Sequence, residues 1–557
     1  MGVGLPHYLQ TRSPPVFLIS LAPLDSFPSG EAIGTAPKRA CARTPVKIIV
    51  NCPLSIVHYQ LSIPILPNQE VHPMYIGIDL GSTNIKAAIY DKNFRLIDRQ
   101  SRPVSYIREN GFVEFDAYAY CCDLLSLLGD ILKANGITQI TELAFTGQAE
   151  SLVVLDKNGK PLMNAISWMD ERSAEECKAL SAQFDPATCE AITGQMAVLP
   201  TWPATKILWL KHNRPEVYEN AATYMLLKDY IVYCLTGVKK ADMSIATFSF
   251  YFDIYAKTYW QEMLSAIGIT EEKLPPLCEP CSVAGDLLPA ISTDWGIAPG
   301  TKVNVGTLDH FAGMIGTGNT APGGITLSTG TVMALTAMSA EPAPRDSGIA
   351  MHYGFLPDTH VMLPVAESGG VSLEWFRRTC MGDTDYDTMN AELLKRGPND
   401  LLFLPYLVGT NAPEFDTDAT GVFWGLRQEH DAIDMAGAVM EGVSFVLKKN
   451  CRNMEKAGLN PTAIIATGGG AKSPVWCQLQ ADITGLPVRI PAEKEAACLG
   501  AAIIAGVSAG EFASFEDAAG QCVAFTHTYE PNPTPRLESK FQKFCALYDA
   551  ALAIARM

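Results

Sequence analysis

The chain has 557 residues, of which 48% are hydrophobic and 18% charged, a composition typical of a globular protein and too apolar for a disordered one. Its 59 acidic and 42 basic residues leave a formal net charge of −17. A surface that acidic repels nucleic-acid phosphates and anionic lipid, so we expect neither nucleic acid nor membrane as a partner. The length predicts about two to four domains.

The cysteines indicate a reducing compartment. Fifteen of them, an odd number, are scattered over the whole chain, which predicts reduced and mostly buried thiols in a cytoplasmic protein. The one CxxC pair, Cys278 and Cys281, has no second pair or histidine at ligand spacing. Because zinc takes four such ligands, we expect no metal there.

Proline sets the first segment apart. Residues 1–73 hold eleven of the 37 prolines, which prevents regular pairing. Three interpretations remain open: a targeting peptide, a disordered tail, or upstream sequence translated from a wrong start. The apolar stretch 16–22 is short and meets proline at once, which disfavours a signal peptide. We expect 1–73 to be a disordered or non-native leader, with Met74 as the functional start.

Two glycine-containing turns predict phosphate sites. The first, with Gly81, Ser82 and Thr83, lies between two apolar strands; the second, with Gly330 and Thr331, repeats that pattern near the middle of the chain. Glycine lets the backbone approach a ligand, and the amides of such a turn form an anion-binding concavity. An ordinary hairpin would explain one such turn, but the repetition favours two similar half-structures that hold a polyphosphate. Asp79, at a strand end, is placed to hold hydrated Mg²⁺.

A triple-glycine turn at 468–470 forms a third element. It follows a buried strand pattern and precedes a helix, so a flat ring or phosphate can lie against its backbone. Ala471 stands where a Walker A loop requires glycine before Lys472, which rejects that motif. The GxGxxA stretch 316–321 follows a helix pattern rather than a strand, which rejects a dinucleotide site.

Asp309 is the candidate for chemistry. It follows a strand pattern at 302–305 and begins a helix pattern, so its carboxylate could point between two lobes. Phosphoryl transfer to an alcohol needs a base aligned with the hydroxyl, a role that Asp fills in kinases. The alternative is a simple helix N-cap. We expect the adjacent His310 to be a packing residue.

A second polar cluster lies upstream. It comprises Gln148, Glu150, Trp168, Asp170 and Arg172, all at predicted strand ends. Tryptophan stacks on the apolar face of a sugar, whereas carboxylates and amides accept hydrogen bonds from its hydroxyls. The alternative is that Trp168 belongs to the core and that Asp170 and Arg172 form a surface ion pair.

With these residues in place, the chain resembles the FGGY carbohydrate kinases, which have the actin-like ATPase fold. The resemblance runs from Met74 to roughly Tyr548 and rests on an ordered set of motifs rather than on one of them. Its segments are 79–83, 203–210, 227–244, 328–331, 421–426 with 434–441, and 468–473. The pair 421–426 and 434–441, similar throughout to a family signature, is the most specific.

The resemblance implies an α/β fold of two actin-like ATPase (ribonuclease H-like) lobes with an active-site cleft between them. Residues 74–318 would form a sugar-binding lobe and 319–557 a nucleotide-binding lobe. The implied ligands are a small-molecule sugar, ATP and Mg²⁺, and a homodimer is left open. The implied site residues are Asp309 as catalytic base; Asp79 near Mg²⁺; Gly81, Ser82, Thr83, Gly330, Thr331, Gly469, Gly470, Ala471 and Ser473 at the nucleotide; and Gln148, Glu150, Trp168, Asp170 and Asp309 at the sugar.

The acceptor is less well defined. Glycerol kinases carry Arg-Glu where this chain has Ala149 and Glu150, and xylulose kinases carry Met-His after the glutamine. The stretch 227–244 nevertheless resembles pentulose kinases, so xylulose is the best single expectation for an ATP-dependent sugar kinase. The alternatives are another acceptor (glycerol, a hexulose or an aldonate), a non-catalytic sugar or nucleotide sensor, and a chaperone-like ATPase.

Overall fold

The computed structural model describes residues 73–557 except 345–346 and 383. The expected leader therefore lies outside the described residues, apart from Pro73. No helix in the described part of the chain combines the length and the hydrophobicity that crossing a membrane requires. Every cysteine that the structure describes has a free thiol, and all but Cys122 and Cys380 are at least partly buried.

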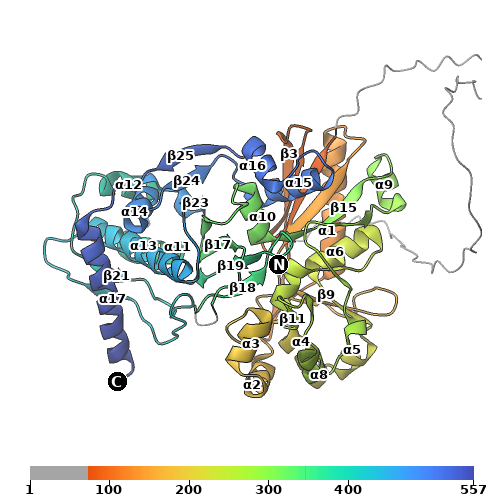
Figure 1. Ribbon diagram of the computed structural model, residues 1–557, viewed down its shortest axis with the longest axis horizontal. Coiled ribbons are helices and arrows are strands. Elements are labelled where there is room, and N and C mark those ends of the chain that lie inside the picture. The colour runs from red at the N-terminus through yellow and green to blue at the C-terminus, as the bar shows by residue number, and fades with distance from the viewer. Residues whose placement is uncertain (1–72, 345–346, 383) are drawn as a thin grey trace, which may run out of the picture. The chain divides into compact units, whose positions relative to one another are not determined.

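The N-terminal half is built on a six-stranded sheet of order β14-β15-β6-β1-β2-β3. Figure 1 labels β3 and β15 of this sheet. Strand β1 pairs antiparallel with β2 and parallel with β6, and β6 pairs parallel with β15. The strands are β1 (Tyr75–Leu80), β2 (Asn84–Tyr90), β3 (Leu96–Pro103), β6 (Glu142–Gly147), β14 (Val283–Asp286) and β15 (Lys302–Leu308). The unbroken apolar stretches of β1, β2 and β6 are buried, as expected for central strands covered on both faces.

The C-terminal half repeats this topology. Its main sheet runs β18-β19-β17-β16-β23-β24-β25, with β16 antiparallel to β17 and parallel to β23, and β23 parallel to β24. The strands are β16 (Gly324–Thr329), β17 (Met333–Ser339), β18 (Met351–Tyr353), β19 (His360–Met362), β20 (Val365–Ala366), β23 (Ala463–Gly468), β24 (Val488–Pro491) and β25 (Phe525–Tyr529). Each half thus has a hairpin, two further parallel strands and an antiparallel edge strand, which confirms the predicted pair of similar lobes.

Helices and smaller sheets complete each half. In the N-terminal half, one five-stranded sheet comprises β4 (Ile107–Glu109), β5 (Phe112–Phe115), β7 (Leu152–Leu155), β8 (Ala165–Ile166) and β9 (Thr223–Leu226). The helices of this half include α1 (Ala117–Ala134), α2 (Ala174–Gln183), α3 (Pro186–Thr193), α4 (Pro203–Asn213), α5 (Pro215–Asn220), α6 (Leu227–Thr236), α7 (Met243–Ala246), α8 (Gln261–Ile267) and α9 (Pro289–Trp295). The C-terminal half adds β21 (Leu402–Leu404), β22 (Val422–Trp424), α11 (Gly370–Cys380), α12 (Tyr386–Leu393), α13 (Ala432–Lys456), α14 (Pro474–Thr484), α16 (Phe515–Cys522) and α17 (Pro535–Ala555). Two short strand pairs are also present: β10 (Ala241–Asp242) with β13 (Leu277–Cys278), and β11 (Phe252–Asp253) with β12 (Thr258–Tyr259). Short 3₁₀ turns lie at 247–249, 271–273 and 470–472.

Two helices join the halves: α10 (Asp309–Gly316), which leads out of β15, and α15 (Ala496–Ser508), which packs on both α10 and β1. Glycine makes this packing close. A Cβ at Gly316 would lie 1.8 Å from the carbonyl oxygen of Ala496, and one at Gly500 would lie 1.8 Å from that of Ala312. Because the neighbours are backbone atoms, no side chain can move aside to make room.

Substituting Gly316 tests this contact. We expect Gly316→Ala to destabilise the protein by about 1–3 kcal/mol through overpacking and to lower its melting temperature. Gly313→Ala in the same helix is the matched control, since its Cβ would meet no atom within 4 Å. The control should be neutral or slightly stabilising. Equal melting temperatures for the two variants would contradict the close approach of α10 and α15.

Candidate functional site

Three predicted site residues follow three neighbouring parallel strands. Gly81 follows β1, Gln148 follows β6 and Asp309 follows β15. The last residues of the three strands are in register, Leu80 with Gly147 and Gly147 with Leu308. The carboxyl ends of parallel strands share one edge of a sheet, which is where open α/β sheets bind ligands. The first glycine turn, Gln148 of the second polar cluster and the candidate base therefore lie at the same edge.

Asp79 and Asp309 are close enough to influence one another. Burial raises the pKa of the Asp79 carboxyl to about 7, and the neighbouring carboxylate of Asp309 adds to that rise. Within the described residues, no donor is recorded for either carboxylate oxygen of Asp79. A partly buried carboxylate without a recorded donor, influenced by a second carboxylate, fits a residue that meets a hydrated cation, so the donor chemistry agrees with the predicted Mg²⁺ site.

Asp309 is not the cap of its helix. The N-cap position of α10 is occupied by Leu308, which makes no side-chain capping bond, and Asp309 lies in the first turn. Its Oδ1 accepts a hydrogen bond from the amide of the next residue, His310, at 2.6 Å. The alternative explanation of Asp309 as a simple N-cap is therefore wrong. The carboxylate is only partly buried and lies beside Asp79.

An ion pair beside this carboxylate pair connects the two halves. Nζ of Lys86 on β2 lies 2.6 Å from Oε2 of Glu495, the residue before α15. The positive charge of Lys86 opposes the rise in the pKa of Asp79, whereas the Glu495 charge adds to it. No local sequence pattern predicts this pair, because its partners lie more than 400 residues apart.

The second and third glycine turns also meet. Strands β16 and β23 are parallel, with Thr329 opposite Gly468, so the turn at Gly330 and the triple-glycine turn leave the same edge of the second sheet. A Cβ at Gly468 would lie 2.7 Å from the carbonyl oxygen of Thr329, and φ there is 79°. Glycine at 468 is thus required for the contact between the strand ends, whether or not a ligand binds there.

The residues of the second and third glycine turns differ in how free their polar groups are to bind a ligand. The amide of Gly330 donates to the carbonyl oxygen of Val332 at 3.0 Å, so it is already occupied. Gly469 is exposed and Ala471 partly buried. Ser473 caps α14: its Oγ accepts from the amide of Trp476 and donates to Oδ1 of Asn390 at 2.8 Å. These contacts give Ser473 a structural role as a helix cap. Its position near adenine stays a prediction.

Gln148 links the second polar cluster, which comprises Gln148, Glu150, Trp168, Asp170 and Arg172, to the first glycine turn. Its Nε2 lies 3.4 Å from the carbonyl oxygen of Gly81, and its Oε1 accepts from Oγ of Ser151 at 2.9 Å. Trp168 is 39% exposed, so the alternative that placed it in the core is wrong. An exposed indole beside strand ends remains available to stack on a sugar.

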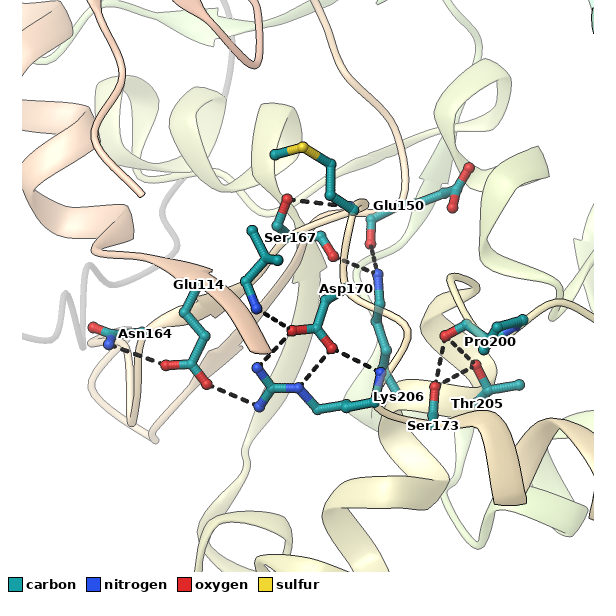
Figure 2. A network of polar contacts seen from close by, with 12 residues as sticks. Glu114, Glu150, Asn164, Ser167, Asp170, Ser173, Pro200, Thr205 and Lys206 are labelled. Carbon is teal, nitrogen blue, oxygen red and sulfur yellow. Dashed lines mark hydrogen bonds and ion pairs between the residues drawn. The ribbon is translucent and has the colours of Figure 1, made fainter. Parts of the chain in front are cut away.

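Asp170 is fully buried and already has four hydrogen bonds (Figure 2). Its carboxylate accepts from the amides of Val113 and Arg172 and from the Arg172 guanidinium, at distances of 2.5–3.0 Å. Arg172 also pairs with Glu114 at 2.8 Å, and its side chain is 1% exposed. The ion pair anticipated from the sequence exists, but placing it at the surface was wrong. Asp170 orders the loop, and its role as a sugar ligand stays a prediction.

Lys206 on α4 connects the two loops of this cluster (Figure 2). Its buried Nζ donates to the carbonyl oxygens of Glu150, at 3.1 Å, and Ser167, at 2.9 Å. Glu150 has a φ of 64°, an unusual value for glutamate, so its backbone needs such support. Burial raises the pKa of the Glu150 carboxyl and lowers the pKa of the Lys206 ammonium, and the opposite charges limit both shifts.

The sequence analysis did not assign a role to Lys206. The signal was present in the segment 203–210, because a lysine flanked by apolar residues on both sides of a helix turn predicts a buried charge that needs partners.

Two cavities, of about 400 Å³ between α13 and α17 and about 210 Å³ beside the β2–β3 hairpin, contain none of the predicted site residues.

Comparison with known proteins agrees with this arrangement. Residues 74–316 match the N-terminal domain of the FGGY family of carbohydrate kinases, and residues 325–509 match its C-terminal domain. A xylulose kinase from Bacillus subtilis is 29% identical over 85% of this chain and 95% of its own length. A gluconokinase from the same organism is 28% identical over 82% of this chain and 91% of its own length.

Solved structures give the same result. A xyloylose kinase from Brucella ovis is 29% identical and superimposes with a TM-score of 0.81, covering 86% of this chain and 100% of its own. The sequence matches extend over both halves and over all three glycine turns. The chain therefore belongs to the FGGY family of carbohydrate kinases and is an ATP-dependent sugar phosphotransferase.

Proposed function

We propose that this enzyme transfers the γ-phosphate of ATP to a hydroxyl of a ketopentose, with xylulose as the preferred acceptor. The observation that carries the proposal is the position of Asp309 at the sheet edge where the first glycine turn and Gln148 also begin. Residues 74–318 would hold the acceptor and 319–557 the nucleotide. The xylulose kinase relatives support the choice of sugar, although a gluconokinase is nearly as similar.

In the proposed reaction the acceptor hydroxyl gives its proton to a carboxylate oxygen of Asp309 as its own oxygen bonds to the γ-phosphorus. The bond from that phosphorus to the bridging oxygen breaks, and ADP leaves. Gly81, Ser82, Thr83 and Thr331 would hold the phosphates from the two turns. Asp79 would hold Mg²⁺ through water, and the bound ion would neutralise charge on the phosphates. Enclosing the sugar and the nucleotide between the two halves would exclude water, a competing acceptor.

The charges around the second polar cluster favour a neutral sugar over an aldonate. Both cations of the network in Figure 2 already have partners: Lys206 binds backbone carbonyls and Arg172 binds Asp170 and Glu114. Neither is left to accept the carboxylate of gluconate, and the Glu150 carboxyl would repel it when ionised. This arrangement supports xylulose above gluconate.

Removing the candidate base should abolish most of the activity. We expect Asp309→Asn to lower kcat for sugar-dependent ADP release by about 10²–10⁴-fold, because the amide cannot accept the proton. Asp294→Asn on α9, an exposed site, is the control and should keep wild-type kcat. Full activity in Asp309→Asn would refute the assignment. ATP turnover that does not depend on any sugar would instead favour a chaperone-like ATPase.

A panel of acceptors tests the substrate. In a coupled ADP assay we expect xylulose to give the highest kcat/KM, at least about tenfold above gluconate, glycerol and hexuloses, because a missing or mismatched polar contact costs at least about 1.4 kcal/mol. A higher kcat/KM for gluconate would show that a cation does reach the acceptor carboxylate. Binding of sugar without turnover would favour a sensor.

Lys206 should affect the acceptor and not the nucleotide. Lys206→Met keeps the side-chain volume but leaves the carbonyls of Glu150 and Ser167 without their donor. We expect the KM for the sugar to rise about 10–100-fold and the KM for ATP to change less than about threefold, measured by varying each substrate. Lys211→Met on the exposed side of the same helix is the control. Equal changes in both KM values would argue against this role.

A further inference from the structure

The strand that leads to Asp309 is irregular just before its end. The pairing of β15 with β6 shifts register between Asn304 and Thr307. Gly306, inside this bulge, has a φ of 69°, and a Cβ there would lie 1.5 Å from the carbonyl oxygen of Phe145. Bulges often re-aim a side chain next to an active site. The bulge interrupts the ladder, so the backbone that carries Asp309 depends on additional contacts.

Ser244 provides one of these contacts. Its side chain is fully buried on the short helix α7. The Oγ atom accepts from the amide of Leu308, at 3.3 Å, and from the hydroxyl of Thr307, at 2.9 Å. It donates to the carboxylate of Asp242 at 2.8–2.9 Å. The hydroxyl thus uses its donor and both acceptor positions, and two of its partners are the residues immediately before Asp309.

The rest of the network fixes Ser244 and the other side of the bulge. Asp242 also accepts from the amide of Ser244, at 2.9 Å, and lies 3.0 Å from Nζ of Lys228. The same ammonium donates to the carbonyl oxygen of Val305 at 2.6 Å. Lys228 and Asp242 are both fully buried, and burial raises the pKa of the adjacent Asp229 carboxyl to about 7.

Burying these charges costs desolvation that an apolar cluster of the same size would avoid. The network nevertheless does something that apolar packing cannot do. Two of its members, Ser244 and Lys228, bind the backbone on either side of the Gly306 bulge. A hydrogen bond is directional, so an oxygen at a fixed position holds a backbone amide in one orientation. Apolar contacts have no preferred direction and cannot do this.

We infer that Ser244 is a positioning residue for the phosphoryl transfer. Through Leu308 and Thr307 it fixes the end of β15, and thereby the direction in which the Asp309 carboxylate meets the acceptor hydroxyl. Lys228 and Asp242 hold Ser244 in place. The inference rests on the proposed role of Asp309 as the base. A misplacement of about 1 Å at a reacting group can cost about 10²-fold in rate.

Ser244→Ala is the first test. We expect kcat to fall about 10–100-fold, with the KM values for sugar and ATP each changing less than about threefold, because binding groups are untouched. Ser249→Ala is the matched control: Ser249 is equally buried in the adjoining turn, and its Oγ accepts only from the amide of Tyr251 among the hydrogen bonds recorded in the described residues. The control should keep wild-type kcat at a similar melting temperature. Unchanged kcat in Ser244→Ala would overturn the inference.

Thr307→Val is the second variant, because it keeps the branched shape and removes one hydrogen bond to Ser244. We expect a smaller fall in kcat, about 3–10-fold, and the variant decides the question if Ser244→Ala does not fold. Wild-type kcat in a folded Thr307→Val would then overturn the inference.

The double variant Ser244→Ala/Asp309→Asn separates this inference from the proposed function. If Ser244 acts through Asp309, its substitution should not lower the residual kcat of Asp309→Asn any further. An equal fall in both backgrounds would overturn the positioning role and leave the base assignment intact. Full activity in Asp309→Asn alone would refute the base assignment itself.

Discussion

The parallel pairing of β1, β6 and β15 is the constraint on which the candidate site depends. Side chains at 79, 148 and 309 are far apart in sequence, and only the register of these three strands brings them to one sheet edge. The buried apolar residues of the strands fix that register, since a slip by one residue would turn their side chains to the opposite face. The chemistry at the edge is thus a consequence of hydrophobic packing within the sheet.

Repetition of the same topology in the second half has a similar effect on the other two glycine turns, where we propose that the nucleotide binds. The parallel pair β16 and β23 brings the turn at Gly330 beside the triple-glycine turn. The two sheets are then joined through α10 and α15, whose backbones approach closely because Gly316 and Gly500 lack side chains. Asp309 is the first residue of α10, so the candidate base and the joint between the halves share one helix.

The sequence was sufficient for the fold and for the location of the turns. Glycine turns between apolar strands and a helix after the triple glycine are local patterns, and each is where it was predicted. The contacts of Asp170 and Lys206 could not be predicted in the same way. A local pattern shows that an ionisable residue lies among apolar ones, but its partners come from distant segments. These are the amide of Val113 for Asp170, and the carbonyls of Glu150 and Ser167 for Lys206.

The same limit explains why the acceptor was the least certain element. Sugar selection depends on which polar groups remain free once the protein has satisfied its own buried groups, and that remainder is a property of the whole network. Here Arg172 and Lys206 are occupied by Asp170, Glu114 and backbone carbonyls, whereas the Trp168 ring is 39% exposed. What the network leaves open is the aromatic face of Trp168, which suits a neutral sugar better than an anion. That remainder supports the proposal of a neutral sugar as acceptor, and the xylulose kinase relatives support a ketopentose among such sugars.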